Sequence, residues 1–341
     1  MARTVDRMRS DRFRGWAPIR LYWKGAEPRP EPWIDWCNLG STRFTDPFYE
    51  TTIERCMRDP FALLFRRQTP ISELCEWRAV QPGIPPTGFI FHMSRCGSTL
   101  ISQMLAAVRR HVVISEGIPI DSVLSPRMAG APSEQRIEWL RSMVAALGQP
   151  RAGDESRYFI KFDAWHIREW ALIRAAFPGV PWIFVYRDPI EVLVSQLNKA
   201  GSWTLPGYLP PEALGIEFAD LARIPRDEYC GRVLALILQS AVSAIEDAAG
   251  DGHLVHYDQL PQAVWTNLAS HFRTTFEHAE IEAMQEAAHY DAKTQGLPFT
   301  PDSEQKRSSA TPRLLRISDE WLSPWYQRLE SKRLSERGAC V

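Results

Sequence analysis

The chain has 341 residues, of which 45% are hydrophobic and 24% are charged. This length is sufficient for one large domain or two small ones with a hydrophobic core, and the composition excludes a disordered or collagen-like chain. Forty basic residues balance forty-one acidic ones, so no overall field draws the protein to nucleic acid or to an anionic membrane. An anionic ligand must therefore be held by local groups.

The N-terminal residues and the cysteines indicate in which cellular compartment the protein is found. No apolar run approaches the roughly 20 residues that a membrane span needs, and the first ten residues are charged with no apolar stretch behind them. The six cysteines are scattered, which argues against a zinc site or a disulfide framework. We expect a cytoplasmic protein with neither a membrane nor a nucleic acid as partner. The cysteines are Cys37, Cys56, Cys75, Cys96, Cys230 and Cys340.

Residues 1–86 differ from the rest of the chain because they mix tryptophan with proline. They contain one helical stretch, 46–55, in which Asp46 suits an N-cap and Pro47 suits a first helical turn. We predict an N-terminal extension of helices and loops over residues 1–86. Prolines and glycines at 82–88 end this segment, and residues 87–341 form the main domain.

From residue 89 onward, short apolar runs of strand type alternate with helical patterns. Continuous apolar runs are typical of parallel strands that are covered on both faces. The pattern predicts an α/β three-layer sandwich with a central parallel sheet flanked by helices, and ligand sites at the carboxyl ends of the strands. The predicted strands are 89–93, 112–114, 158–161, 182–186 and 254–257.

The second half of the chain holds a loop-like stretch and several helices. Prolines and glycines within 201–225 predict a lid over residues 200–227. Residues 229–249 form the strongest candidate for a buried helix, and shorter helices are predicted at 263–272 and 281–289. The tail from Gly296 is predicted to be a loop with one short helix near 319–329.

The first strand is followed by Ser94-Arg-Cys-Gly-Ser-Thr99 and then by a helical pattern. Small residues between a strand and a helix turn several backbone N–H groups toward one point, with the positive end of the helix behind them. Arg95 adds a fixed charge. The segment predicts an anion-binding loop; the alternative is an ordinary strand-to-helix turn.

The loop differs from two common nucleotide-binding motifs. An ATP- or GTP-hydrolysing loop has the pattern G-x-x-x-x-G-K-[ST], and no lysine precedes Ser98 or Thr99. The dinucleotide pattern G-x-G-x-x-G is also absent from this unit. A nucleoside triphosphatase and a dinucleotide enzyme are therefore disfavoured.

Two segments resemble motifs of sulfotransferases that use 3′-phosphoadenosine 5′-phosphosulfate (PAPS). Residues 91–101 resemble the loop that binds the 5′-phosphosulfate, and 185–195 resemble the 3′-phosphate motif. In that motif an arginine that ends a strand and a serine eight positions later share one phosphate, and Arg187 and Ser195 keep this spacing. The resemblance runs from about residue 88 to 306, and its pattern is nearest to the tyrosylprotein sulfotransferases.

The resemblance implies roles for three residues in sulfuryl transfer. Glu116 matches the catalytic base, and Lys161 matches the lysine that stabilises the transition state. Arg95 is expected to stabilise charge on the leaving phosphate and the transferring sulfonate. His166 is a rival base, because imidazole is the commonest proton acceptor in catalysis.

The resemblance also implies PAPS as cosubstrate, adenosine 3′,5′-bisphosphate as product and no metal requirement. Lys306 matches a late cofactor-binding lysine, although Arg307 beside it would serve equally. The implied cofactor-binding residues are Ser94, Arg95, Cys96, Gly97, Ser98, Thr99, Leu100, Arg187, Ser195, Tyr257, Lys306 and Arg307.

Two other functions remain open at this point: a nucleotide-dependent kinase or hydrolase on the same loop, and a non-catalytic nucleotide-binding protein. The acceptor is expected to be a hydroxyl of a small molecule or a peptide. Trp203, Leu205, Tyr208 and the neighbouring prolines suggest an apolar lid over the acceptor pocket.

Overall fold

The computed structural model describes residues 11–24, 31–125, 128, 130–209, 211–247, 250–294 and 296–338. Cys340 lies outside these residues, as do short parts of the predicted N-terminal extension and of the predicted lid.

Five parallel strands form the central sheet, in the order β5-β6-β4-β7-β8. All residues of β4, β5 and β7 are buried, which explains why each of them reads as a continuous apolar run. The predicted three-layer α/β fold is confirmed, and each predicted strand lies within two residues of an observed one. The strands are β4 (Gly88–His92), β5 (His111–Ser115), β6 (Arg157–Lys161), β7 (Trp182–Tyr186) and β8 (Gly252–His256).

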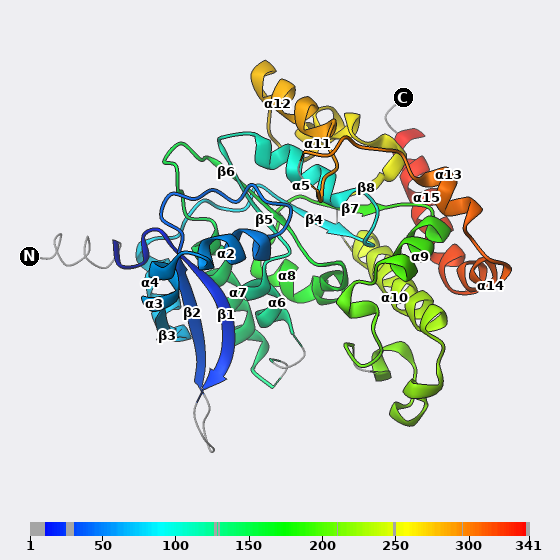
Figure 1. Cartoon of the computed structure of the whole chain (residues 1–341), viewed down its shortest axis with the longest axis horizontal. Helices are drawn as coiled ribbons and strands as arrows, with labels where there is room; N and C mark the ends of the chain where they lie inside the picture. The colour runs from blue at the N-terminus through cyan, green and yellow to red at the C-terminus, as the bar shows by residue number, and fades with distance from the viewer. Residues whose placement is uncertain are drawn as a thin grey trace, which may run out of the picture.

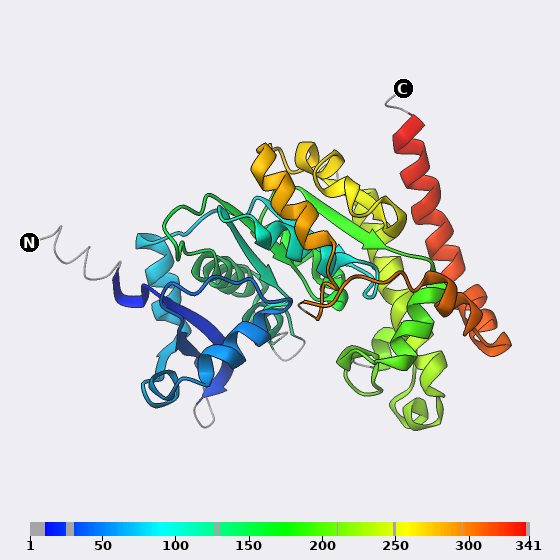
Figure 2. The same cartoon turned by 45° about the horizontal axis from the view of Figure 1, so that its top comes forward.

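Helices cover both faces of this sheet (Figure 1). On one face lie α5 (Ser98–Ala107), α11 (Asn267–His271) and α12 (His278–Ala288), and Figure 2 shows them above the strands. On the other face lie α7 (Ser133–Leu147), α8 (Trp170–Ala176) and α10 (Arg226–Asp247). The sequence analysis predicted α5, α10, α11 and α12, whereas it did not identify α7.

Helix α10 has 22 residues and is long and apolar enough to span a membrane by length and composition alone. This corrects the expectation that no apolar segment approaches that length. In its most apolar window, 61% is buried inside the protein, as in the core helix of a globular domain.

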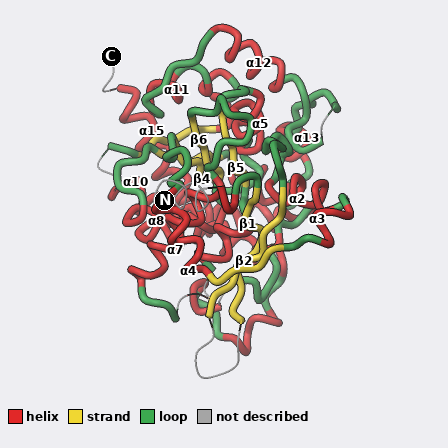
Figure 3. The backbone as a smooth tube through the Cα atoms, turned by 90° about the vertical axis from the view of Figure 1, so that its left-hand side faces the viewer, coloured by secondary structure: helices red, strands yellow, loops and turns green. Residues whose placement is uncertain are grey.

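A second sheet, antiparallel and three-stranded, lies in the N-terminal part of the chain. Its strands are β1 (Trp16–Lys24), β2 (Glu31–Asn38) and β3 (Arg67–Pro70), and Figure 3 shows β1 and β2 apart from the central sheet. The prediction of helices and loops alone for residues 1–86 is therefore wrong. Pro18 and Pro32 interrupt the strand patterns in the sequence, and the structure accommodates Pro18 in the edge strand β1.

The helices of the N-terminal part connect its sheet to the main domain. Helix α2 (Tyr49–Met57) begins later than predicted, because Asp46 does not cap it: its carboxylate accepts hydrogen bonds from Thr52 Oγ1 at 2.7 Å and Arg55 Nη2 at 2.8 Å. Arg43 donates to the carbonyl oxygens of Ala106 and Val108 at the end of α5. The other helices of the N-terminal part are α3 (Pro60–Leu64) and α4 (Ile71–Val80), while α6 (Ile118–Leu124) of the main domain packs on β1.

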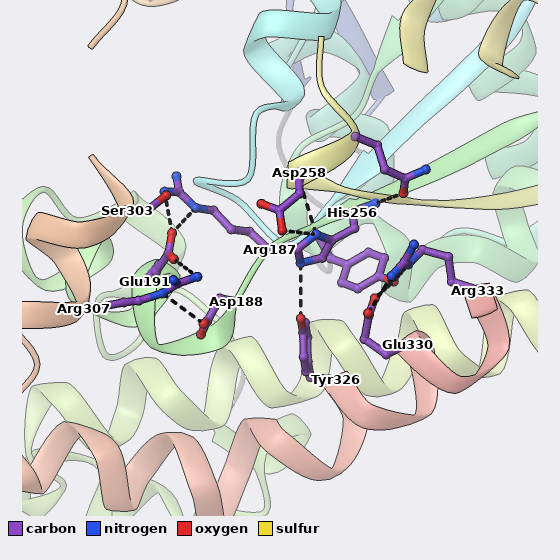
Figure 4. A network of polar contacts seen from close by, with 12 residues as sticks. Arg187, Asp188, Glu191, His256, Asp258, Ser303, Arg307, Tyr326, Glu330 and Arg333 are labelled. Carbon is purple, nitrogen blue, oxygen red and sulfur yellow. Dashed lines mark hydrogen bonds and ion pairs between the residues drawn. The ribbon is translucent and has the colours of Figure 1, made fainter. Parts of the chain in front are cut away.

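The C-terminal part is more helical than predicted. A loop with one short helix was expected after Gly296, but α13 (Ser303–Ser308), α14 (Pro312–Ile317), a π-helical turn (Ser318–Leu322) and α15 (Ser323–Gly338) occupy most of it. Glu330 of α15 accepts a hydrogen bond from the hydroxyl of Tyr186 at the end of β7, and Arg333 donates to the same hydroxyl. Helix α15 is thereby fixed beside β7 and β8 (Figures 2 and 4).

The predicted lid, 200–227, follows α9 (Pro189–Asn198). Its described part holds three short 3₁₀ turns: η4 (Ser202–Thr204), η5 (Pro211–Leu214) and η6 (Phe218–Arg223). Trp203 is buried, whereas Leu205 and Tyr208 are exposed. The segment is therefore anchored by Trp203 at its start and by the buried Leu209 and Ile216 farther along.

Candidate functional site

The loop between β4 and α5 has the backbone of an anion-binding turn. Ser94 (φ 72°), Arg95 (φ 52°) and Gly97 (φ 89°) all adopt left-handed conformations. No described residue accepts a hydrogen bond from the backbone N–H of Arg95, Cys96 or Gly97. Successive free N–H groups at the start of a helix form a concave site for an anion.

Gly97 and Cys96 are both small residues of this loop, and the structure explains each of them differently. A Cβ atom on Gly97 would lie 2.6 Å from Leu260 Cδ1 and 3.0 Å from Tyr257 Cδ2, so no larger residue fits without movement. The thiol of Cys96 is buried, its Sγ donates to Val185 O at 3.0 Å, and burial raises its pKa to about 11. Cys96 therefore contributes its backbone to the loop and carries an unreactive thiol.

The loop forms one wall of a cavity of about 210 Å³, called cavity 1 here. Ten of the twelve predicted cofactor-binding residues line it: Arg95, Cys96, Gly97, Ser98, Thr99, Leu100, Arg187, Ser195, Tyr257 and Lys306. The two exceptions are Ser94 and Arg307. Two strand-helix junctions that lie about 90 residues apart in the sequence thus meet at one cavity, as the parallel sheet requires.

Arg187, at the end of β7, is held in place by a network of polar contacts (Figure 4). Its Nε donates to Glu191 at 2.5 Å, its Nη2 donates to Ser303 Oγ at 2.7 Å and to Asp302 Oδ1 at 3.0 Å, and its guanidinium stacks on the ring of Tyr257. Burial alone would lower its pKa, but these acidic neighbours raise the pKa overall. Arg187 is therefore a fixed cation.

The contacts of Lys306 and Arg307 differ. Lys306 lines cavity 1 and pairs with Asp302 at 2.7 Å. Arg307 pairs with Glu191 at 2.7 Å and with Asp188 at 3.5 Å, on the opposite side of Glu191 from Arg187 (Figure 4), and it does not line cavity 1. The geometry places Lys306, and not Arg307, at the cavity.

A second cavity of about 150 Å³, called cavity 2 here, lies on the other side of the same loop. It shares Arg95, Ser98, Thr99 and Lys293 with cavity 1. The remaining lining residues come from the ends of β4, β5 and β6, from α9 and from the start of the predicted lid: they include His92, Ser94, Glu116, Asp163, Gln196 and Trp203.

Glu116 and Lys161 lie together at the edge of cavity 2. Lys161 Nζ donates to Glu116 Oε1 at 2.5 Å and lies 3.3 Å from Thr99 Oγ1, while His92 Nε2 is 3.5 Å from the same carboxylate. The Glu116 side chain reaches the cavity, whereas Lys161 is fully buried beneath it. Burial alone would raise the pKa of Glu116, but Lys161 and His92 more than offset this, and the pKa falls below its ordinary value.

His166 does not reach cavity 2. Its Nδ1 accepts a hydrogen bond from the backbone N–H of Asp163, and its Nε2 lies 3.0 Å from Asp121 Oδ1. Because Nδ1 accepts, the proton of the imidazole is on Nε2, which donates to Asp121. Both ring nitrogens are thus engaged, and the arrangement favours Glu116 over His166 as the base.

Two residues that the sequence analysis did not identify also lie at the site. Lys293, in the loop after α12, lines both cavities. The residue as a whole is exposed, but its ammonium is partly removed from water. This burial, together with the positive charges of Arg95 and Lys161, lowers the pKa of Lys293 to about 8. Asp163 lines cavity 2, and burial together with the charge of Glu116 raises its pKa to about 7. No sequence motif marks Lys293 as a site residue. Asp163 follows the end of the predicted strand at Lys161 by two residues, and this position at the carboxyl edge of the sheet could have identified it as a site residue.

The N-terminal part also reaches the site. Phe48, next to the start of α2, lines cavity 2, and the ammonium of Lys161 lies 4.9 Å from the centre of its ring. The buried Trp203 forms another aromatic wall. The walls of cavity 2 therefore come from both the N-terminal part and the main domain.

Comparison with known proteins gives matches among solved structures only. No family model and no curated protein matches the chain. Sulfotransferase STF9 from Mycobacterium avium is 13% identical with a TM-score of 0.47, covering 74% of this chain and 83% of that one. The sulfotransferase domain of the curacin biosynthetic pathway is 14% identical with a TM-score of 0.41, covering 70% and 98%.

A third similar structure is retinol dehydratase in complex with androsterone and the inactive cofactor PAP. It is 11% identical with a TM-score of 0.35, covering 76% of this chain and 88% of that one. At these identities and scores the likenesses say nothing about the residues of the site, and the functional argument depends on the geometry described above.

Proposed function

We propose that this protein transfers a sulfuryl group from PAPS to an acceptor hydroxyl and releases adenosine 3′,5′-bisphosphate. The observation that carries the proposal is the arrangement of two cavities on either side of one anion-binding loop. Cavity 1 holds fixed cations and the predicted phosphate-binding residues, and cavity 2 is lined by Glu116, whose carboxylate pairs with the buried Lys161 beneath it. A donor and an acceptor can thus meet across Ser98 and Thr99.

The residues of cavity 1 fit the two anionic ends of such a donor. The free N–H groups of the loop, with Ser98 and Thr99 at the start of α5, would hold the 5′-phosphosulfate. Arg187, Ser195 and Lys306 would hold the 3′-phosphate, and the exposed rings of Tyr290 and Phe299 supply apolar surface for the base. When bound, PAPS would supply the sulfuryl group, and adenosine 3′,5′-bisphosphate would be the leaving group.

The residues around cavity 2 would carry out the proton transfer. The carboxylate of Glu116 takes the proton of the acceptor hydroxyl as the acceptor oxygen bonds to sulfur and the bond from sulfur to the phosphate oxygen breaks. Lys161 holds Glu116 in its ionised form, and Arg95 and Lys293 stabilise the charge that develops on the leaving phosphate. Positioning and charge stabilisation provide most of the catalysis in such transfers.

We place this reaction in the cytoplasm, with no membrane and no nucleic acid as partner. The balanced charge of the chain supports the absence of a nucleic-acid or anionic-membrane partner, and the free cysteines among the described residues support a reducing compartment. The finer assignment to the tyrosylprotein type depends on the match of Glu116 and Lys161 to its motif alone, and we propose a hydroxyl acceptor without restricting it to tyrosine.

Thermal-shift titration tests the donor. We expect adenosine 3′,5′-bisphosphate to raise the melting temperature, by the equivalent of about 2.7 kcal/mol at 100 times its Kd, and ATP with magnesium to have no comparable effect. Arg187→Ala should abolish the shift, while Arg109→Ala, an exposed arginine paired with Asp154 away from the cavities, should keep it. Stabilisation by ATP with magnesium instead would support a kinase or hydrolase, and binding without turnover of any hydroxyl would support a non-catalytic protein.

A further inference from the structure

A third cavity, of about 460 Å³ and called cavity 3 here, lies between β1, α6 and the middle of the predicted lid. Four aromatic residues line it: Tyr22, Trp23, Trp165 and Tyr208. Asp121 is the one charged residue among the described residues that line it. The described lining of cavity 3 therefore combines aromatic surface with one negative charge.

The carboxylate of Asp121 is fixed on one side only. Its Oδ1 accepts hydrogen bonds from Trp165 Nε1 at 3.1 Å and from the neutral imidazole of His166 at 3.0 Å. No described residue donates to Oδ2, and the side chain is 30% exposed. The neighbours thus orient the carboxylate without neutralising it.

This combination selects for a particular kind of ligand. Aromatic faces attract cations through their quadrupole, and the attraction increases when the cation is partly removed from water. A fixed carboxylate adds a Coulombic attraction of the same sign. An alkylammonium group, with apolar carbon around its charge, is attracted both by the aromatic faces and by the carboxylate. An anion or a neutral sugar carries no positive charge and gains neither of these two attractions.

Cavity 3 is close to cavity 2. Three segments each supply one residue to cavity 2 and another to cavity 3: the pairs are Glu116 and Asp121, Asp163 and Trp165, and Trp203 and Tyr208. Asp163 and Trp165 are two positions apart, which limits their Cα separation to about 7 Å, whereas the other two pairs are five positions apart and are limited only to about 18 Å. The pair of Asp163 and Trp165 therefore brings the two cavities within reach of one small molecule.

We infer that cavity 3 binds an alkylammonium group. Granted the sulfuryl transfer proposed above, this group is the distal end of the acceptor, whose hydroxyl enters cavity 2 beside Glu116. The acceptor class is then a hydroxyl compound that carries an amine.

The binding site is tested by isothermal titration calorimetry with choline and its uncharged carbon isostere, 3,3-dimethylbutan-1-ol. We expect choline to bind at least tenfold more tightly than the isostere, and Asp121→Asn to remove this difference. Asparagine retains an oxygen for Trp165 and His166, so the variant should keep its fold, which its melting temperature checks. Tyr208→Ala should weaken choline binding several-fold, whereas Phe218→Ala, at an exposed ring outside the cavity, should not.

Equal binding of choline and its isostere, or undiminished choline binding by a folded Asp121→Asn variant, would overturn the inference. If adenosine 3′,5′-bisphosphate binds and choline does not, the ammonium site is wrong while the proposed transfer stands. If choline binds and the bisphosphate does not, the ammonium site stands and its assignment to the acceptor falls.

The assignment to the acceptor has its own measurement. Release of adenosine 3′,5′-bisphosphate from PAPS is followed with hydroxyalkyl-trimethylammonium compounds of increasing chain length and with their uncharged isosteres. We expect the charged member to be preferred at least tenfold in kcat/KM at the best length, and Asp121→Asn to lose this preference. Equal rates for charged and uncharged members would contradict the assignment.

Discussion

At the scale of single residues, the chemistry that we propose for cavity 2 depends on the pair of Glu116 and Lys161. The resemblance to a family motif suggested both residues, and the structure brings their side chains to 2.5 Å. What the sequence did not convey is that Lys161 is fully buried and acts beneath Glu116 and Thr99. This depends on how β5 and β6 pair in the sheet, which places Ser115 opposite Lys161.

Glu116→Gln removes the proposed base while it keeps the shape of the side chain. We expect kcat to fall by about 10²–10⁴-fold, with the Kd for adenosine 3′,5′-bisphosphate within about twofold of wild type, because cavity 1 is unchanged. Steady-state kinetics with a true acceptor and a binding titration measure the two quantities. A variant with full turnover would exclude Glu116 as the base.

Lys293 gives the site a pH dependence. Its pKa is about 8 in the free protein, so its ammonium is charged below that pH and attracts the phosphates, and it loses its charge as the pH rises. We expect affinity for adenosine 3′,5′-bisphosphate to decrease from pH 7 to pH 9 in the wild type. Lys293→Arg should remove most of this decrease and Lys293→Met should give weak binding at both values, as titrations at each pH will show.

At the scale of elements, the junction of β4 and α5 explains why the central sheet was predictable. Its strands are short and buried, so their apolar runs stand out in the sequence, and the glycine and small residues of the loop mark its turn. Strand β1 was missed because a partly exposed antiparallel strand lacks a continuous apolar run. Strand β2 is mostly buried, but Pro32 and Asp35 interrupt its apolar residues. Helix α15 was predicted too short because few of its residues are apolar.

Gly97→Ala tests the fit of this junction. The substitution places a methyl group 2.6 Å from Leu260 Cδ1 at a φ of 89°, and we expect a loss of about 1–3 kcal/mol in the free energy of unfolding together with weaker nucleotide binding. Gly153→Ala is the matched control, because Gly153 has a φ of 93° and open space around its Cα. Chemical denaturation should show a larger loss for Gly97→Ala; equal losses would mean that Leu260 and Tyr257 move aside freely.

At the scale of the whole molecule, the N-terminal part completes the site that the α/β domain begins. Phe48 comes from this part, and Lys293 comes from the loop after α12, which packs on α5. Neither position belongs to a local motif, because each reaches the cavities only through tertiary packing. The sequence therefore predicted the lining of cavity 1 more fully than that of cavity 2.

Phe48→Ala tests this contribution. Loss of the ring opens one wall of cavity 2, and we expect KM for the acceptor to rise several-fold while the Kd for adenosine 3′,5′-bisphosphate is unchanged. Phe61→Ala removes an exposed ring from the same part of the chain and should change neither quantity. An unchanged KM in Phe48→Ala would mean that the acceptor does not contact the N-terminal part.

The most direct measurement is a crystal structure of the protein with adenosine 3′,5′-bisphosphate. Our account predicts that the 5′-phosphate lies on the loop at residues 94–99, that the 3′-phosphate contacts Arg187 and Ser195, and that the 5′ end faces Glu116. A nucleotide bound elsewhere, or one whose 3′-phosphate lies away from both Arg187 and Ser195, would contradict it.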